Sequence, residues 1–123
     1  MGVTGVVAQL RTTDLAASIR FYTETLGLAL EFQYQDFYAG IRAGGQVLHL
    51  KQVDEPDPSV KYVADAEHFH LYLQVDDAAE FAQVLVHKGV RLVKPVADTA
   101  WQTREFVITD DQGHTLYVGQ ALA

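Results

Sequence analysis

The sequence predicts an α+β fold made of two copies of one βαβββ module. An amphipathic helix runs from Asp14 to Gly27 and a second from Asp76 to Gly89, so an aspartate suited to an N-cap and a helix-ending glycine recur at the same spacing. Each helix is followed by β-patterned segments that end in a glycine-led strand, first at 45–50 and then at 113–118. This recurrence indicates a duplicated unit.

The first copy begins with a strand at 6–12, in which Val7, Gln9 and Arg11 share one face. The helix that follows has an apolar stripe, formed by Leu15, Ile19, Tyr22 and Leu26. Three more strands are expected at 28–35, 37–42 and 46–53, the last two joined by a hairpin turn at Gly44-Gly45. In the first of these, alternation predicts a half-buried strand with four residues on one face: Leu28, Leu30, Phe32 and Tyr34.

A linker at 54–59 separates the copies, because two prolines and three acidic residues cannot continue a central strand. The second copy then contains a strand at 68–75, the helix at 76–88, and strands at 90–96, 104–109 and 114–120. The stripe of its helix consists of Ala78, Phe81, Ala82 and Leu85. We therefore expect a single domain, 1–123, composed of modules 1–58 and 59–123.

The alternation of side chains along the strands indicates which sheet face could bind a ligand. In three strands the aliphatic residues occupy one face, which is the natural seat for the two helices, as in Leu48 and Leu50 or Leu116 and Val118. The opposite face carries polar and aromatic residues: His49, Lys51, His68, His70, Tyr72, Gln74 and Tyr117. No helix remains to cover that face. It is either open to solvent or wrapped around a ligand.

Composition narrows the class of partner. Sixteen acidic against nine basic side chains give a formal charge of −7, whereas nucleic-acid binding needs a basic face. Without cysteine there is no disulfide or thiolate chemistry, which suits a reducing compartment. The chain has neither a signal-peptide pattern nor an apolar run long enough to span a membrane. We expect a soluble cytoplasmic protein that binds neither nucleic acid nor membrane.

The run from Leu10 to Gly27, LRTTDLAASIRFYTETLG, resembles the opening motif of the vicinal oxygen chelate superfamily. This superfamily includes glyoxalase I, extradiol dioxygenases, and fosfomycin- and bleomycin-resistance proteins. The closing run from Trp101 to Gly113, WQTREFVITDDQG, is similar to a stretch frequent in the bleomycin-resistance branch. With the central 70–76 segment, the resemblance covers essentially the whole chain. It implies paired βαβββ modules that form an incomplete barrel around a cleft, in a homodimer.

Enzymes of the superfamily hold a divalent metal on four side chains. Carried over position by position, the resemblance places these four at Val7, His49, His70 and Tyr117. Valine has no lone pair, and a phenol is a poor ligand for metals that prefer carboxylate and imidazole. Only His49 and His70 remain, with His68 as a third candidate. We therefore predict no metal, no cofactor and no catalytic residue, and expect His68 to lie at an exposed rim.

The favoured function is metal-free binding of a small molecule, similar to sequestering proteins of the antibiotic-resistance branch. Aromatic stacking would hold the ligand, and Trp101, which follows a weakly apolar segment, is expected at the mouth of the site. Arg11 either pairs with a ligand anion or neutralises an internal acid. The predicted ligand-binding residues are Gln9, Arg11, Tyr38, His49, His70, Tyr72, Trp101 and Tyr117.

Two alternatives remain open. The first is a metal-dependent lyase, isomerase or dioxygenase that uses His49 and His70, with His68 or the substrate as a third ligand. The second is a metal-free enzyme in which one imidazole acts as general base. Arg104 is read as structural, and Asp110, Asp111 and Gly113 as turn residues.

Overall fold

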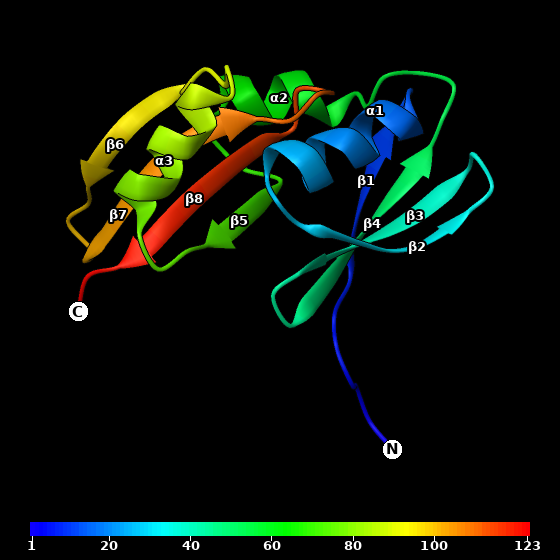
Figure 1. Ribbon diagram of the computed structural model, residues 1–123, viewed down its shortest axis with the longest axis horizontal. Helices are drawn as coiled ribbons and strands as arrows, with labels where there is room; N and C mark the ends of the chain where they lie inside the picture. Colours follow the sequence, from blue (N-terminus) through cyan, green and yellow to red (C-terminus); the bar gives the residue numbers. More distant parts are fainter. The chain divides into compact units, whose positions relative to one another are not determined.

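The computed structural model describes all residues from Met1 to Ala123, and the chain divides into two compact units, Met1–Asp57 and Pro58–Ala123. Each unit contains a four-stranded mixed sheet (Figure 1). The strand order is β1-β4-β3-β2 in unit 1 and β5-β8-β7-β6 in unit 2, so both sheets have the same topology. The α+β class and the duplicated module predicted from the two helices are confirmed.

Unit 1 follows the predicted order of strand, helix and three strands. Strand β1 is parallel to β4, whereas the β2/β3 and β3/β4 pairs are antiparallel. The helix changes from α-helical to π-helical geometry partway along. The elements of unit 1 are β1 (Ala8–Thr12), α1 (Leu15–Arg20), η1 (Phe21–Thr25), β2 (Ala29–Tyr34), β3 (Tyr38–Ala43) and β4 (Gln46–Gln52).

Unit 2 contains one helix that the sequence analysis did not predict. Its elements are α2 (Ser59–Asp65), β5 (Leu71–Gln74), α3 (Ala78–His87), β6 (Lys94–Asp98), β7 (Thr103–Thr109) and β8 (Thr115–Ala121). The prolines near residue 57 suggested only a linker. Pro58, however, is the N-cap of α2 with a φ of −67°, and proline's fixed φ suits the start of a helix. Lys61 and Asp65 then pair one turn apart.

Two strands of unit 2 are placed differently from the prediction. The strand expected at 68–75 spans only Leu71–Gln74, because Glu67, at a φ of 59°, makes the turn that leads out of α2. The strand expected at 90–96 begins at Lys94 instead. Val90 still belongs to the end of α3, since its N–H donates to the carbonyl of Leu85.

The second helix begins one residue later than the sequence suggested. Asp77, not Asp76, is its N-cap, and the Asp77 carboxylate accepts a hydrogen bond from the N–H of Glu80. Asp14 has the same role in α1, where it accepts from the N–H of Ala17. Ala78, Ala82 and Leu85 are buried as predicted, and their spacing sets the register that makes Asp77 the cap.

Each unit buries the face of its sheet that the parity argument assigned to a helix. Helix α1 packs on β3 and β4, and α3 packs on β6, β7 and β8 (Figure 1). Buried aliphatic side chains line these contacts, among them Leu48, Leu50, Leu116 and Val118. None of the helices has the length and apolar character needed to cross a lipid bilayer.

Strand β2 departs from the half-buried pattern expected for it, because all six of its residues are exposed. It is an edge strand with a β-bulge at Glu31, so Leu30 pairs with Ile41 while Phe32 pairs with Gly40. The bulge changes the parity. Leu30 lies on the helix side of the sheet, and Phe32 and Tyr34 lie on the side without a helix.

Candidate functional site

The sheet of unit 1 presents an aromatic and polar surface on its uncovered face. Register places Gln9 beside His49, His49 beside Gly40, and Gly40 beside Phe32, so these four positions form one row across the sheet. Tyr38 belongs to the neighbouring row, between Lys51 and Tyr34. Residues from four separate strands thus converge on one face.

Three of these side chains form a hydrogen-bonded chain. The Gln9 amide donates to the Tyr38 hydroxyl at 2.9 Å, and that hydroxyl lies 3.0 Å from Nδ1 of His49. The Gln9 N–H occupies one acceptor position of the hydroxyl, and the contact with His49 is compatible with either neutral tautomer of the imidazole.

Aromatic rings pack around His49. The rings of Phe32 and Tyr38 lie edge-on to the imidazole, with centroids at 5.4 and 5.2 Å, and stack on each other at 6.4 Å. A side chain at Gly40 would overlap the Phe32 ring, so glycine is required beneath it. The cluster is a preformed apolar surface with one imidazole at its centre.

Arg11 forms an ion pair within unit 1. Its guanidinium lies 3.1 Å from the carboxylate of Asp57, whose side chain is only 6% exposed. Of the two roles considered for Arg11, the geometry favours neutralisation of an internal acid. Lys51 Nζ lies 5.9 Å from the centroid of the Phe37 ring, a cation–π arrangement.

The uncovered face of the unit 2 sheet has a second aromatic cluster. Tyr72 and Tyr117 are register neighbours on β5 and β8, and the ring of Phe69 contacts both, with centroids at 5.7 and 5.3 Å. Gly119 lies below the Tyr72 hydroxyl, and a side chain there would overlap it. A glycine under an aromatic side chain therefore recurs in both units.

Tyr72 is tied to an acidic residue of β7. Its hydroxyl donates to Glu105 Oε2 at 2.7 Å, and the Thr103 hydroxyl donates to the same oxygen at 2.9 Å. Burial, together with the hydrogen bond to the Glu105 carboxylate and its charge, raises the pKa of Tyr72 to about 12. The phenol is therefore a neutral donor over the physiological pH range.

Trp101 lies in the turn between β6 and β7 and is 69% exposed. No aromatic ring of the structure packs against the indole. The prediction that this tryptophan is on a loop rather than in the core is confirmed. His68 is also exposed, as expected for a rim position, and its ring lies 6.0 Å from that of Tyr62.

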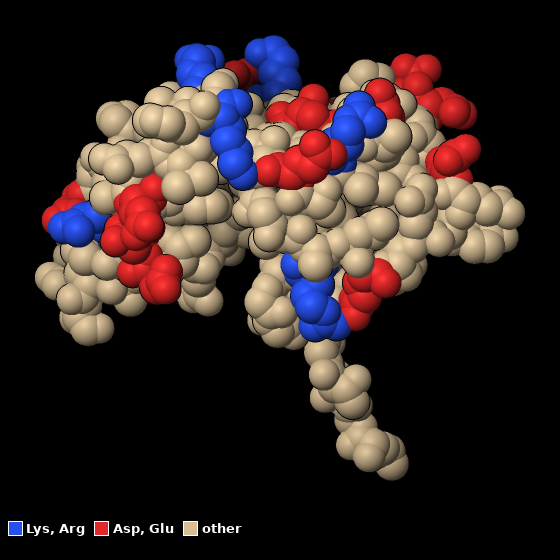
Figure 2. All heavy atoms as spheres, in the orientation of Figure 1, with Lys and Arg blue, Asp and Glu red and all other residues tan.

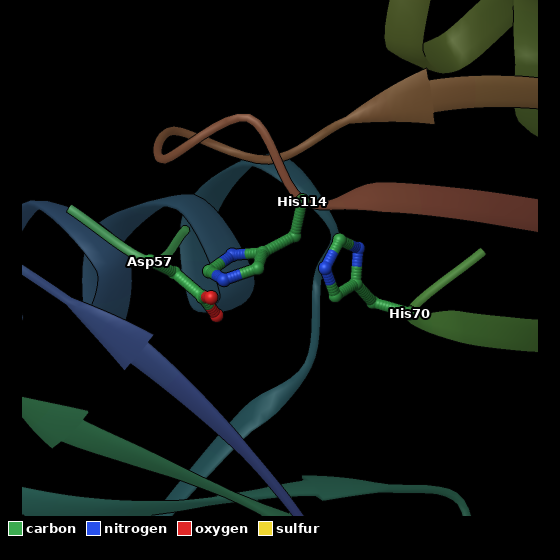
Figure 3. Close-up of side chains that lie close together, drawn as sticks. All are labelled: Asp57, His70 and His114. Atoms are coloured by element: carbon green, nitrogen blue, oxygen red, sulfur yellow. The ribbon is translucent and has the colours of Figure 1, made fainter. Parts of the chain in front are cut away.

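His70 belongs to a network that the sequence analysis did not anticipate. Its ring lies edge-on to that of His114, with centroids 4.8 Å apart (Figure 3). The Thr115 N–H donates to His70 Nδ1 at 3.0 Å, so the neutral ring carries its proton on Nε2, which lies 3.0 Å from the Ser59 hydroxyl. A protonated Nε2 donates to Ser59 and cannot take its proton. This geometry does not activate the serine as a nucleophile.

His114 is 1% exposed and is held by Asp110, four residues earlier. Nδ1 of His114 lies 2.8 Å from Asp110 Oδ2, and Asp110 Oδ1 accepts from the N–H groups of Gln112 and His114. Gly113 completes the turn with a φ of 90°. The turn predicted at 110–113 is confirmed, and its first aspartate also orients a buried imidazole.

The four positions that the resemblance assigns to a metal fit one poorly. Val7 is aliphatic, and the Tyr117 hydroxyl donates to the carbonyl of Glu67. At His70 the Nδ1 lone pair accepts a hydrogen bond from the Thr115 N–H, so the neutral ring carries a hydrogen rather than a lone pair on Nε2. Only His114, oriented by a carboxylate, has the arrangement typical of a metal-bound histidine.

The structure groups the predicted site residues into two sets. Gln9, Tyr38 and His49 lie together in unit 1, and Tyr72 and Tyr117 lie together in unit 2. The sequence analysis missed Phe32, because the β2 bulge changes its face, and Phe69, which precedes its strand. It also missed Glu105, although its alternation with buried Phe106 could have revealed it.

Charged side chains do not gather into a basic patch on the face shown in Figure 2, where acidic and basic groups are interspersed. Many are paired with each other, as in Lys94 with Glu67 and Arg104 with Asp98. These pairs are exposed. Arg104 thus has the structural contact expected of it, at the β6/β7 edge of the sheet.

Comparison with known families finds one match, the glyoxalase/bleomycin resistance protein/dioxygenase superfamily, over residues 5–118. No curated protein sequence matches the chain.

Solved structures with the same fold include TioX from Micromonospora sp. ML1, with 19% identity, 98% of both chains covered and a TM-score of 0.75. Another is the bleomycin-binding protein of bleomycin-producing Streptomyces verticillus, solved with copper(II)-bleomycin, at 23% identity and a TM-score of 0.69 over 100% of this chain and 98% of that one. A glyoxalase-related enzyme from Fulvimarina pelagi matches at 23% identity and a TM-score of 0.70, over 96% and 88%. At these identities the likeness concerns the fold.

Proposed function

Because the chain belongs to the glyoxalase/bleomycin resistance protein/dioxygenase superfamily, we propose that it is a non-catalytic binding protein for a small aromatic molecule. The ligand is held without a metal, against the aromatic residues on the uncovered face of a sheet. The bleomycin-binding protein of similar fold provides a precedent for ligand binding on this scaffold. The protein would act in the cytoplasm by sequestering its ligand, as resistance proteins do.

The observation that carries this proposal is the aromatic lining of both uncovered faces. In unit 1 the rings of Phe32 and Tyr38 pack against His49. In unit 2 the ring of Phe69 contacts those of Tyr72 and Tyr117. Rings of this kind favour stacking and apolar contact with a planar ligand, while the few polar groups among them fix its orientation. The glycines beneath the rings keep these surfaces flat.

The donor set supports metal-free binding. A metal at His70 would need the lone pair of Nε2, and the tautomer that provides it would turn an Nδ1 proton toward the Thr115 N–H. The same contact argues against His70 as a general base through Nε2. Ligand binding requires neither metal coordination nor a general base.

Trp101→Ala tests the proposal. The indole makes no ring contact and is exposed, so its loss should leave the melting temperature nearly unchanged. Binding of N-phenyl-1-naphthylamine, followed by its fluorescence, should weaken by about five-fold, the equivalent of one stacking contact. Tyr62→Ala, which removes an exposed ring from α2, is the matched control and should leave binding intact. Equal binding by the Trp101 variant, or a parallel loss of stability, would contradict the role assigned to the indole.

The metal-dependent alternative is favoured by one observation, the carboxylate-oriented imidazole of His114 beside His70. Elemental analysis of protein purified without chelator distinguishes the two functions. A stoichiometric transition metal that is lost on His49→Ala or His70→Ala would replace the binding role by a metal-dependent enzyme.

A further inference from the structure

Glu105 has one satisfied oxygen and one open oxygen. Oε2 accepts both hydroxyl protons, from Tyr72 and Thr103, whereas Oε1 has no partner in the protein. Oε1 is also not among the buried unpaired atoms, so it reaches solvent. The half-buried carboxylate is therefore fixed in orientation and presents one oxygen outward from the uncovered face of β7.

No basic side chain neutralises this carboxylate. Within unit 2, Lys61 pairs with Asp65, Lys94 with Glu67, and Arg104 with Asp98, while Glu105 forms no ion pair. A half-buried carboxylate without a counter-ion is unfavourable unless hydrogen bonds or a bound cation compensate it. The two hydroxyl groups compensate only in part, because they contribute dipoles and no charge.

Aromatic rings lie near the carboxylate. Tyr72 contacts Glu105 directly, and the rings of Phe69 and Tyr117 continue the surface. Glu105 pairs in register with Gly119, which has no side chain to cover the carboxylate. A negative charge near aromatic rings is an arrangement that favours organic cations. The neutral Tyr72 phenol, with its pKa raised to about 12, leaves the negative charge on Glu105.

From this juxtaposition we infer that the ligand is an organic cation, a planar ring system bearing a quaternary or protonated nitrogen. The positive nitrogen lies against Glu105, and the ring packs on Phe69, Tyr72 and Tyr117. This inference rests on the proposed binding function and adds the chemical class of the ligand. The formal charge of −7 acts in the same direction by attracting cations.

The test compares two probes of the same shape, the cation N-methylquinolinium and its neutral isostere 1-methylnaphthalene, by calorimetric or NMR titration of the full chain. The cation should bind about ten-fold more tightly than the neutral probe, as expected for a charge-assisted contact beside aromatic rings. The preference should decrease as salt is added. Glu105→Gln keeps the shape and an acceptor for both hydroxyls. It should abolish the preference while affinity for 1-methylnaphthalene is unchanged.

Glu67→Gln is the matched control, since it removes an equal charge from an exposed carboxylate of the same unit that Lys94 already pairs. It should leave the preference intact. Equal affinity for both probes, or a preference that persists in Glu105→Gln, would overturn the cation inference and leave the proposed function standing. Binding of neither probe would count against both.

Discussion

At the scale of single residues, the hydrogen-bond partners of a histidine decide what its ring can do. His70 accepts a hydrogen bond at Nδ1 from the Thr115 N–H, so its neutral ring carries the proton on Nε2, which suits ligand recognition better than metal coordination. Nδ1 of His49 instead contacts the Tyr38 hydroxyl, a group that can donate or accept. His114 has the reverse arrangement, with Nδ1 against the Asp110 carboxylate. Three histidines of one chain are thus given different chemistry by their immediate neighbours.

The pKa of Tyr72 provides a prediction at this scale. Burial and the Glu105 carboxylate raise it from 10.0 to about 12. Between these two pH values the unfolded phenol ionises while the folded one stays protonated. The unfolded state then binds fewer protons, so folding stability is lost as pH rises through this window. Tyr72→Phe should remove this loss, and should delete from the ultraviolet titration one ionisation centred at about pH 12.

Glu105→Gln is the control for the cause of the shift. Without the carboxylate charge, the pKa of Tyr72 should fall toward 10.0, although burial still holds it above that value. If the ionisation deleted by Tyr72→Phe were centred near pH 10 in the otherwise unchanged protein, the contact between Tyr72 and Glu105 would not exist in solution.

At the scale of secondary-structure elements, packing decides helix ends between which the local sequence does not choose. Asp76 and Asp77 are equally suited to an N-cap, and only the packing of Ala78, Ala82 and Leu85 distinguishes them. Helix α2, which the sequence analysis missed, shows a similar ambiguity. Proline ends a strand, but Pro58 also begins a helix, because its φ of −67° is already helical.

The two aspartates form a matched pair for a stability measurement. Asp77→Ala removes the carboxylate that accepts from the Glu80 N–H, and should cost about 1 kcal/mol of unfolding free energy, as N-cap losses do. Asp76→Ala should change it by less than about 0.5 kcal/mol, the usual range for a surface substitution. Urea denaturation followed by circular dichroism measures both. Equal effects of the two substitutions would be inconsistent with Asp77 as the cap.

At the scale of the whole molecule, duplication produces two sheets of the same order, each with one face opposite the helix α1 or α3. Strand β2 adds an unpaired edge that carries exposed Leu30, Phe32 and Tyr34. Exposed apolar edges favour pairing with another chain, and proteins commonly cover them in an assembly. This surface supports the homodimer that the family resemblance implies.

Sedimentation equilibrium tests the assembly. The protein should have twice the 13.6 kDa mass of the chain. Tyr34→Lys places a charge on the β2 edge and should shift the equilibrium toward the monomer, because lysine on an edge strand opposes pairing. Lys61→Glu, on exposed α2, changes charge elsewhere and should not. A monomer at every concentration would contradict the expected homodimer.

The sequence by itself determined the duplicated module, the α+β class and the helix-covered faces, because these follow from periodicity, caps and turns, which are local. Tertiary structure decided which side chains meet. A bulge in β2 brought Phe32 to the uncovered face, and the β7/β8 register left Glu105 opposite a glycine and beside Tyr72. The Thr115 N–H sets the tautomer of His70. Such contacts join residues far apart in the chain, and no local pattern encodes them.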